Sequence, residues 1–189
     1  MDIHQIKKYW TNTDEELYTY KPSQLENPRL LQTTIDFLVN CGLPDSCAPG
    51  LSFDECNGTA IPTPNQVFNI DIDELNDYLM IGSNGSGDPV CIDLNNKNEI
   101  VYLNHDNDFE RVYMNASVKQ LTECIIRYKD FHASLNPRFE NNTFFRRKFT
   151  DEEFSKVCND FKSIDDKCLV ENNCWKAELD YLLWERDNE

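Results

Sequence analysis

The sequence predicts an α+β fold in which a mainly antiparallel sheet is flanked by helices. Short runs of β-branched and aromatic residues, joined by tight Gly- and Asn-rich turns, fill residues 78–115. Stretches with helical spacing lie before and after this run, at 27–42 and from 117 onwards. Because no helix separates one strand from the next, the order is typical of α+β and not of alternating βαβ units.

The first expected helix spans residues 27–42. Asn27 is suited to cap its first amides, and Pro28 fits a first helical turn, where its missing N–H would be unpaired in any case. Gly42 supplies the left-handed residue with which many helices end. These three signals together predict a helix that is capped at both ends.

Strands are expected next. The Pro-, Gly- and Cys-rich segment 43–68 predicts two short extended pieces, at Leu51–Phe53 and Val67–Phe68. A Gly-Ser-Asn-Gly-Ser-Gly-Asp stretch after the first main strand superficially resembles a phosphate-binding loop, but a strand and not a helix follows it. A hairpin turn is therefore the better interpretation. The main strands are expected at 78–82, 89–94, 100–106 and 112–116.

Helices follow the strands. Ser117 with Gln120, and Thr150 with Glu153, form capping boxes, in which a hydroxyl and a longer polar side chain satisfy unpaired backbone amides. A polar, partly basic connection joins the two helices that these boxes open. A last helix is expected at 173–186, with four large apolar residues that include two tryptophans expected to anchor it to the core: Trp175, Leu179, Leu182 and Trp184.

These elements predict a single domain over residues 1–189, with a core at about 27–135 and a helical C-terminal extension at about 150–186. A chain of 189 residues is long enough to bury a core, and its hydrophobic content of 40% is that of a folded protein. The sequence leaves the oligomeric state open.

Charge restricts the classes of function. The net charge is −16, and residues 71–110 hold ten acids and one base, whereas 111–150 hold three acids and eight bases. Such a field opposes binding to a nucleic-acid backbone, because phosphate binders need cationic surface. An acidic protein instead attracts basic partners and accelerates their capture. We therefore expect a basic protein partner and no nucleic acid.

Location and cofactors are constrained by what the sequence lacks. No stretch approaches 18 consecutive apolar residues, and the first residues form no apolar leader, so a cytoplasmic protein without a membrane partner is expected. None of the eight cysteines has Cys-x-x-Cys spacing, and only three histidines accompany them. Reduced thiols are expected on these grounds, with no metal and no cofactor.

The candidate partner-binding residues are acids in the turns and strand ends of the same sheet. Hairpin connectivity is expected to bring several of them onto one rim, giving a negative surface for a basic partner. The alternative is a solvated acidic face, with the interface elsewhere. The candidates are Asp71, Asp73, Glu74, Asp77, Asp88, Asp106, Asp108 and Glu110.

No catalytic residue is predicted. The sequence has no Gly-x-Ser-x-Gly elbow, and the acidic run 71–77 does not place Gly and Glu where a calcium loop needs them. His105, Asp106 and Asp108 do combine imidazole and carboxylates at one strand end. An alternative function is therefore a small-molecule-binding or hydrolytic enzyme that uses this strand end within a concave pocket.

Several segments occur in a distinctive order: Phe37–Pro44, Leu51–Phe53, Tyr78–Gly82, Gly85–Asp93, Val101–Asp106 and Met114–Val118. In this order they resemble the SUKH superfamily of bacterial immunity proteins, named for Syd, US and Knr homology. The late segments Ile164–Asp165 and Trp175–Leu179 are similar to the tail of one subgroup, so the resemblance covers roughly residues 27–183.

The resemblance implies an antiparallel sheet flanked by helices, and a protein that binds and neutralises a cognate polymorphic toxin, often a nuclease or a deaminase. It implies no shared catalytic residues, so no active site is carried over to this chain. Gly82, Gly87, Asn115 and Ser117 are interpreted as structural positions. Because the family also includes regulatory proteins, a regulatory protein-binding scaffold is a further alternative.

Overall fold

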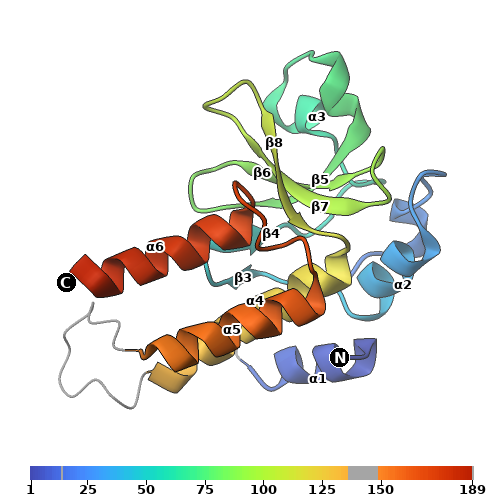
Figure 1. The fold of residues 1–189 in the computed structure, drawn as a ribbon. Helices are drawn as coiled ribbons and strands as arrows, with labels where there is room; N and C mark the ends of the chain where they lie inside the picture. The colour runs from blue at the N-terminus through green and yellow to red at the C-terminus, as the bar shows by residue number, and fades with distance from the viewer. Residues whose placement is uncertain (14, 136–148, 189) are drawn as a thin grey trace.

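The computed structural model describes residues 1–13, 15–135 and 149–188. It is an α+β fold built on a six-stranded sheet whose strands follow chain order and pair antiparallel throughout, as the sequence predicts (Figure 1). A separate two-stranded ribbon pairs β1 (Leu17–Tyr18) with β2 (Leu43–Pro44). The six strands are β3 (Ser46–Cys47), β4 (Leu51–Phe53), β5 (Tyr78–Ser83), β6 (Pro89–Asp93), β7 (Glu99–Asn104) and β8 (Glu110–Asn115).

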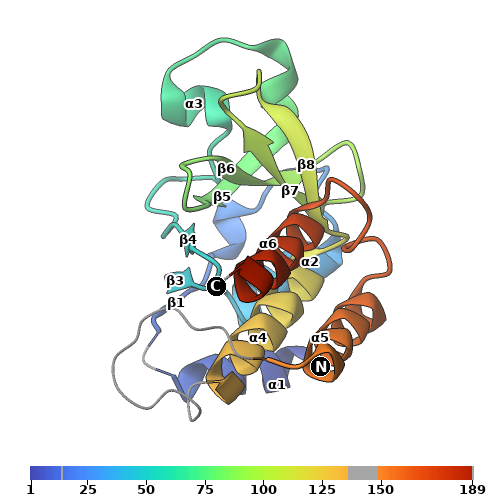
Figure 2. The same ribbon diagram turned by 60° about the vertical axis from the view of Figure 1, so that its left-hand side comes forward.

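The helices lie on two sides of this sheet. Figures 1 and 2 place α1, α4 and α5 together on one side, and α3 on the opposite side. The α-helices are α1 (Ile3–Thr11), α2 (Gln32–Asn40), α3 (Pro64–Phe68), α4 (Val118–Leu135), α5 (Asp151–Ile164) and α6 (Cys174–Asn188). Two short 3-10 helices are η1 (Pro22–Gln24) and η2 (Asp73–Asp77).

Each face of the sheet has its own apolar cluster. In β5, Leu79 and Ile81 join the large cluster beneath the long helices, whereas Tyr78 and Met80 pack against a small cluster on the other face. This alternation follows from the two-residue period of a strand. The sheet is therefore covered on both faces, but very unequally.

Helix α2 begins later than the sequence predicts. Asn27 Oδ1 accepts a hydrogen bond from Arg29 N at 2.9 Å and so forms a local turn. The amide of Leu31, the N-cap residue, is satisfied by Asn98 Oδ1 at 2.7 Å, from a distant hairpin. The helix therefore begins at Gln32 without a side-chain cap from Leu31, and the bond to Asn98 fixes the residue that precedes the helix.

The other helix-end predictions agree with the structure. Gln120 N donates to Ser117 Oγ at 3.3 Å ahead of α4, and Glu153 N donates to Thr150 Oγ1 at 3.2 Å ahead of α5. Gly42 has φ +82°, and an added Cβ would meet the Tyr18 carbonyl oxygen at 2.4 Å. Both the backbone angle and this contact require glycine.

Two local predictions are wrong. Val67 and Phe68 lie in α3 and not in a strand, because Thr63 caps this short helix through Gln66 N. Trp184 is 60% exposed and does not anchor α6, whereas Trp175 is fully buried. Only one of the two tryptophans faces the core, since they lie nine residues apart on the helix, which is half a turn out of phase.

A buried polar network holds the C-terminal extension against the sheet. Asp165 Oδ2 accepts from Tyr113 Oη at 2.8 Å, Asn115 Nδ2 at 3.1 Å and the Ala116 amide at 2.9 Å. The indole N–H of Trp175 donates to Asn115 Oδ1 at 2.7 Å. Burial and the bond to Asp165 hold the pKa of Tyr113 well above its ordinary range. The extension is thus bonded to β8 by satisfied buried groups.

Among the described helices, none combines the length and the apolar character needed to cross a bilayer.

Candidate partner-binding surface

The segment from α3 through η2 covers the second face of the sheet. Leu75, from η2, is buried there with Cys91, Val101 and Leu103 of the strands. Partly buried residues complete the packing: Ile70, Tyr78, Met80 and Phe109. This cover is small, and it leaves apolar side chains of its own exposed.

One buried side chain fixes the shape of the cover. Asn65 Nδ2 donates to the Ile72 carbonyl oxygen at 2.8 Å, and Asn65 Oδ1 accepts from the Ile72 amide at 3.2 Å. The same Nδ2 contacts Asn76 Oδ1 at 3.1 Å. A single amide therefore holds the start of α3 against the chain that enters η2.

An exposed apolar patch lies on this cover. Val67 is 47% exposed, Phe68 39% and Ile72 37%, and all three fall within six residues of the chain. The ring of Phe68 contacts that of Phe109, which belongs to the β7–β8 hairpin, with centroids 6.2 Å apart. We call Val67, Phe68, Ile72 and Phe109 the α3 patch.

The hairpin presents Phe109 at a conformational cost. Asp108 and Phe109 have φ of +49° and +57°, the left-handed region that bulky L-residues rarely adopt. Such residues cost on the order of 1–3 kcal/mol each. The hairpin holds this geometry through the Glu110 amide, which donates to the Asn107 carbonyl oxygen at 2.8 Å. This turn holds the aromatic ring of Phe109 against α3.

Six of the eight predicted acids flank the α3 patch. The Phe68–Phe109 contact joins the two segments that carry these acids, so both groups lie beside the same apolar patch. All six residues are exposed. They are Asp71, Asp73 and Glu74 from the cover, and Asp106, Asp108 and Glu110 from the hairpin. The β7–β8 hairpin brings its three acids together, and the packing of Phe68 against Phe109 joins them to the cover.

Asp77 is bonded to neighbouring side chains. Its carboxylate pairs with Arg29 Nη1 at 2.6 Å and accepts from Asn95 Nδ2 at 2.8 Å, and these bonds, led by that from Arg29, lower its pKa. The register pairs Tyr78 with Asp93, so Asp77 lies at the end of β5 opposite to the turn that carries Asp88. Five strand steps separate the two ends, about 17 Å. Asp77 and Asp88 therefore lie at opposite ends of the strand and do not share one rim of the sheet.

Asp88 is buried and occupied by internal bonds. Its Oδ1 accepts from the His105 amide at 3.0 Å and contacts His105 Nδ1 at 2.7 Å, while Oδ2 accepts from Asn84 Nδ2 at 2.8 Å. Burial would raise the pKa of Asp88, but the bonds from Asn84 and His105 outweigh it and hold the pKa below its ordinary value. Asp88 therefore positions the β7–β8 hairpin and is not itself accessible to a partner.

The alternative catalytic residues lie on the outside of the same hairpin. His105 Nε2 is 3.5 Å from Asp106 Oδ1, and the side chains of Asp106 and His105 are 88% and 39% exposed. Asp108 is exposed as well. Water-accessible carboxylates on a hairpin tip lack the enclosed environment that catalytic groups use. Within the described ranges, no group of three or more His, Cys, Asp or Glu side chains is arranged to hold a metal ion.

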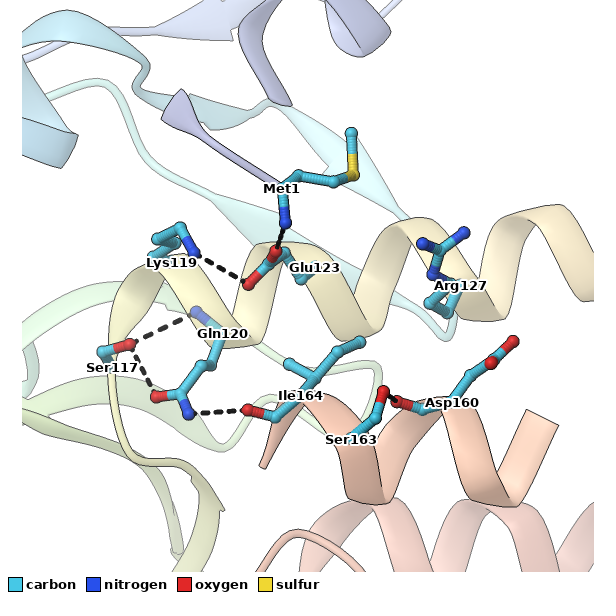
Figure 3. Close-up of a pocket in the computed structure, with 9 residues that line it drawn as sticks. All are labelled: Met1, Ser117, Lys119, Gln120, Glu123, Arg127, Asp160, Ser163 and Ile164. Atoms are coloured by element: carbon cyan, nitrogen blue, oxygen red, sulfur yellow. Dashed lines mark hydrogen bonds and ion pairs between the residues drawn. The ribbon is translucent and has the colours of Figure 1, made fainter. Parts of the chain in front are cut away.

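A polar pocket of about 450 Å³ lies elsewhere, between α4 and α5 (Figure 3). Glu123 contacts both Lys119 Nζ, at 3.2 Å, and the Met1 nitrogen. Gln120 Nε2 donates to the Ile164 carbonyl oxygen at 2.8 Å. These lining groups bond to one another across the two helices, so they serve first to hold α4, α5 and the first residues of the chain together.

Sequence reasoning missed the apolar part of the surface. It identified the acids from composition, but it assigned Val67 and Phe68 to a short extended piece. A Thr-Pro-x-Gln sequence at 63–66 is a helix-start signal that precedes them. A helix of five residues has too little surface to bury both Val67 and Phe68. The shortness of this helix was therefore the sequence signal that could have predicted their exposure.

Comparison of the chain with family models, with curated proteins and with solved structures found no match.

Proposed function

We propose that this chain is a non-enzymatic immunity protein of the SUKH type that binds a basic protein toxin in the cytoplasm and neutralises it. The observation that carries the proposal is the α3 patch flanked by six exposed acids. An apolar centre with a charged rim is the usual anatomy of a protein–protein interface. Neither a metal nor a cofactor is needed for this role.

The charge of the surface supports a basic partner. Toxins that cleave or modify nucleic acids hold their substrate with cationic side chains, because phosphates must be neutralised. An acidic protein that covers such a groove replaces the phosphate charge and excludes the substrate. Opposite fields also accelerate encounter, which suits an inhibitor that must act before damage occurs.

The test is co-expression with the toxin encoded beside the gene. Wild-type protein is expected to restore growth of cells that make the toxin, and continued killing would contradict the proposal. A triple variant, Asp71→Asn, Asp73→Asn and Asp108→Asn, removes three rim charges. Its matched control removes three exposed acids from other surfaces: Glu26→Gln, Glu152→Gln and Asp166→Asn. Reduced protection is expected from the first variant only.

A regulatory scaffold would use the same surface, because its partners are also proteins. A pull-down with purified wild-type protein separates the two roles by the identity of the partner. Recovery of the neighbouring toxin supports immunity, and recovery of only cell-wall or signalling proteins supports the scaffold.

A further inference from the structure

We infer that the partner contacts this chain through a basic amphipathic segment, which places an apolar side chain on the α3 patch between flanking Lys or Arg residues. This inference rests on the proposed function and specifies the chemistry that the surface recognises.

Exposed apolar side chains are concentrated at the α3 patch. Three of the eight large hydrophobic residues that are exposed in the described structure, Val67, Phe68 and Ile72, fall within one six-residue stretch. Scattered single hydrophobics are normal on a protein surface, but a contiguous group marks an interaction site. The apolar side chains of this five-residue helix and of the residues after it lie at the surface and not in the core. A partner can therefore contact them.

The β7–β8 turn places an aromatic ring against the patch. Asp108 and Phe109 both occupy left-handed conformations, and neither is Gly. A β7–β8 turn with Gly at these positions would satisfy the same connection at lower cost. The side chain of Phe109 supports Phe68 from below, and that of Asp108 is exposed beside it. The β6–β7 turn has the same pair of left-handed residues, Lys97 and Asn98, so the geometry belongs to the turn type. What distinguishes the β7–β8 turn is the Phe109 ring that it places against Phe68.

The negative charge of the rim selects the occupant. Two copies of this chain that met through their α3 patches would bring six acids against six acids, so self-association is opposed. Anionic lipid and nucleic acid are repelled for the same reason. A segment with Lys or Arg on both sides of a Leu, Met or aromatic residue satisfies the rim and the centre at the same time.

The two parts of the surface have separable kinetic roles. Rim acids act through long-range attraction, so their loss lowers the association rate and its dependence on salt. Desolvated apolar contacts at the centre act after encounter, so their loss raises the dissociation rate. The Val67→Ser/Phe68→Ser variant is expected to raise the dissociation rate at least about tenfold and to change the association rate less than about twofold.

The experiment is a selection of peptides from a random phage-displayed library against the intact protein. Selected sequences are expected to carry an apolar residue flanked by Lys or Arg, and to lose binding to the Val67→Ser/Phe68→Ser variant. Trp184→Ser is the matched control, because it removes from α6 an aromatic ring that is more exposed still, at 60% against 39% for Phe68. Circular dichroism and the unfolding midpoint confirm that each variant is folded. Val67→Ser alone, at the most exposed position of the patch, replaces the double variant if the latter unfolds.

Three results would overturn the inference: selected peptides without basic residues, peptides that bind the double variant as well as wild type, or peptides that lose binding only to Trp184→Ser. Each of these is compatible with protection against the toxin in cells. Failure of the inference is therefore distinguishable from failure of the proposed function, which the co-expression test decides.

Discussion

The two faces of the sheet use their apolar residues in opposite ways. The face beneath the long helices buries Trp10, Trp175 and Phe161 completely, within one continuous cluster. The other face buries Cys91, Val101 and Leu103 beneath Leu75 of the α3–η2 cover and leaves Val67 and Phe68 exposed. This chain therefore buries most of its apolar side chains on one face, whereas the other face leaves apolar surface exposed.

The largest expected effects are on the stable face, at Asp165 and at Trp175. Asp165→Ala leaves the Tyr113 hydroxyl, the Asn115 amide and the Ala116 amide without their buried acceptor, so we expect a loss of about 3 kcal/mol in the free energy of unfolding. Urea denaturation measures it. Asp166→Ala, at the neighbouring exposed residue, is the control and should cost less than about 0.5 kcal/mol. Equal effects for the two variants would mean that the buried network does not hold the extension.

The next largest effect on stability is expected in the α3–η2 cover, on the opposite face of the sheet. Asn65→Ala removes the side chain that bonds both backbone groups of Ile72, and we expect it to cost about 1–2 kcal/mol. The loss should appear as faster hydrogen exchange at the Ile72 amide, with α4 and α6 amides unchanged. Uniformly faster exchange throughout the chain would show that the cover unfolds together with the main core.

Low pH should destabilise the β7–β8 hairpin, which carries three of the six exposed acids. The folded pKa of Asp88 lies below the ordinary value of 3.8, so its carboxylate stabilises the fold above that pH, and the contribution is lost as pH falls through the folded pKa. Asp88→Asn should therefore be less stable than wild type near neutral pH, and the difference should shrink below pH 3.8. A difference that stays constant across unfolding curves from pH 7 to acid would contradict this. Exposed Asp71→Asn serves as the control near neutral pH, where it should change little.

The smallest expected effect is on α6. Trp184→Ser should change the free energy of unfolding by less than about 0.5 kcal/mol, because an exposed side chain leaves no cavity. Trp175→Ala, on the same helix, should cost about 3–5 kcal/mol. Thermal and urea unfolding of the two variants compare the loss of a buried tryptophan with the loss of an exposed one. Similar losses would show that Trp184 is buried in solution.

Local signals predicted the local features of this fold. Ser117 with Gln120 and Thr150 with Glu153 each place both partners of a capping box within four residues, so the sequence alone identifies the starts of α4 and α5. The predicted strands likewise form one antiparallel sheet, because their alternation and turns are local.

Contacts between distant residues explain what the sequence could not predict. Leu31 obtains its acceptor from Asn98, which fixes the residue that precedes α2. Asp88 is in a polar turn in sequence, yet His105 from the next hairpin buries it. In the same way, the six accessible acids share a surface because Phe68 meets Phe109, a contact between residues that no local pattern connects.

The most direct test of the partner-binding surface is hydrogen exchange of this protein with and without the toxin encoded beside its gene. We predict slower exchange on binding in residues 64–74 and 105–111, which carry the α3 patch and its six acids, with α6 unchanged. Slower exchange confined to α5 and α6, with residues 64–74 and 105–111 unaffected, would contradict the assignment of this surface.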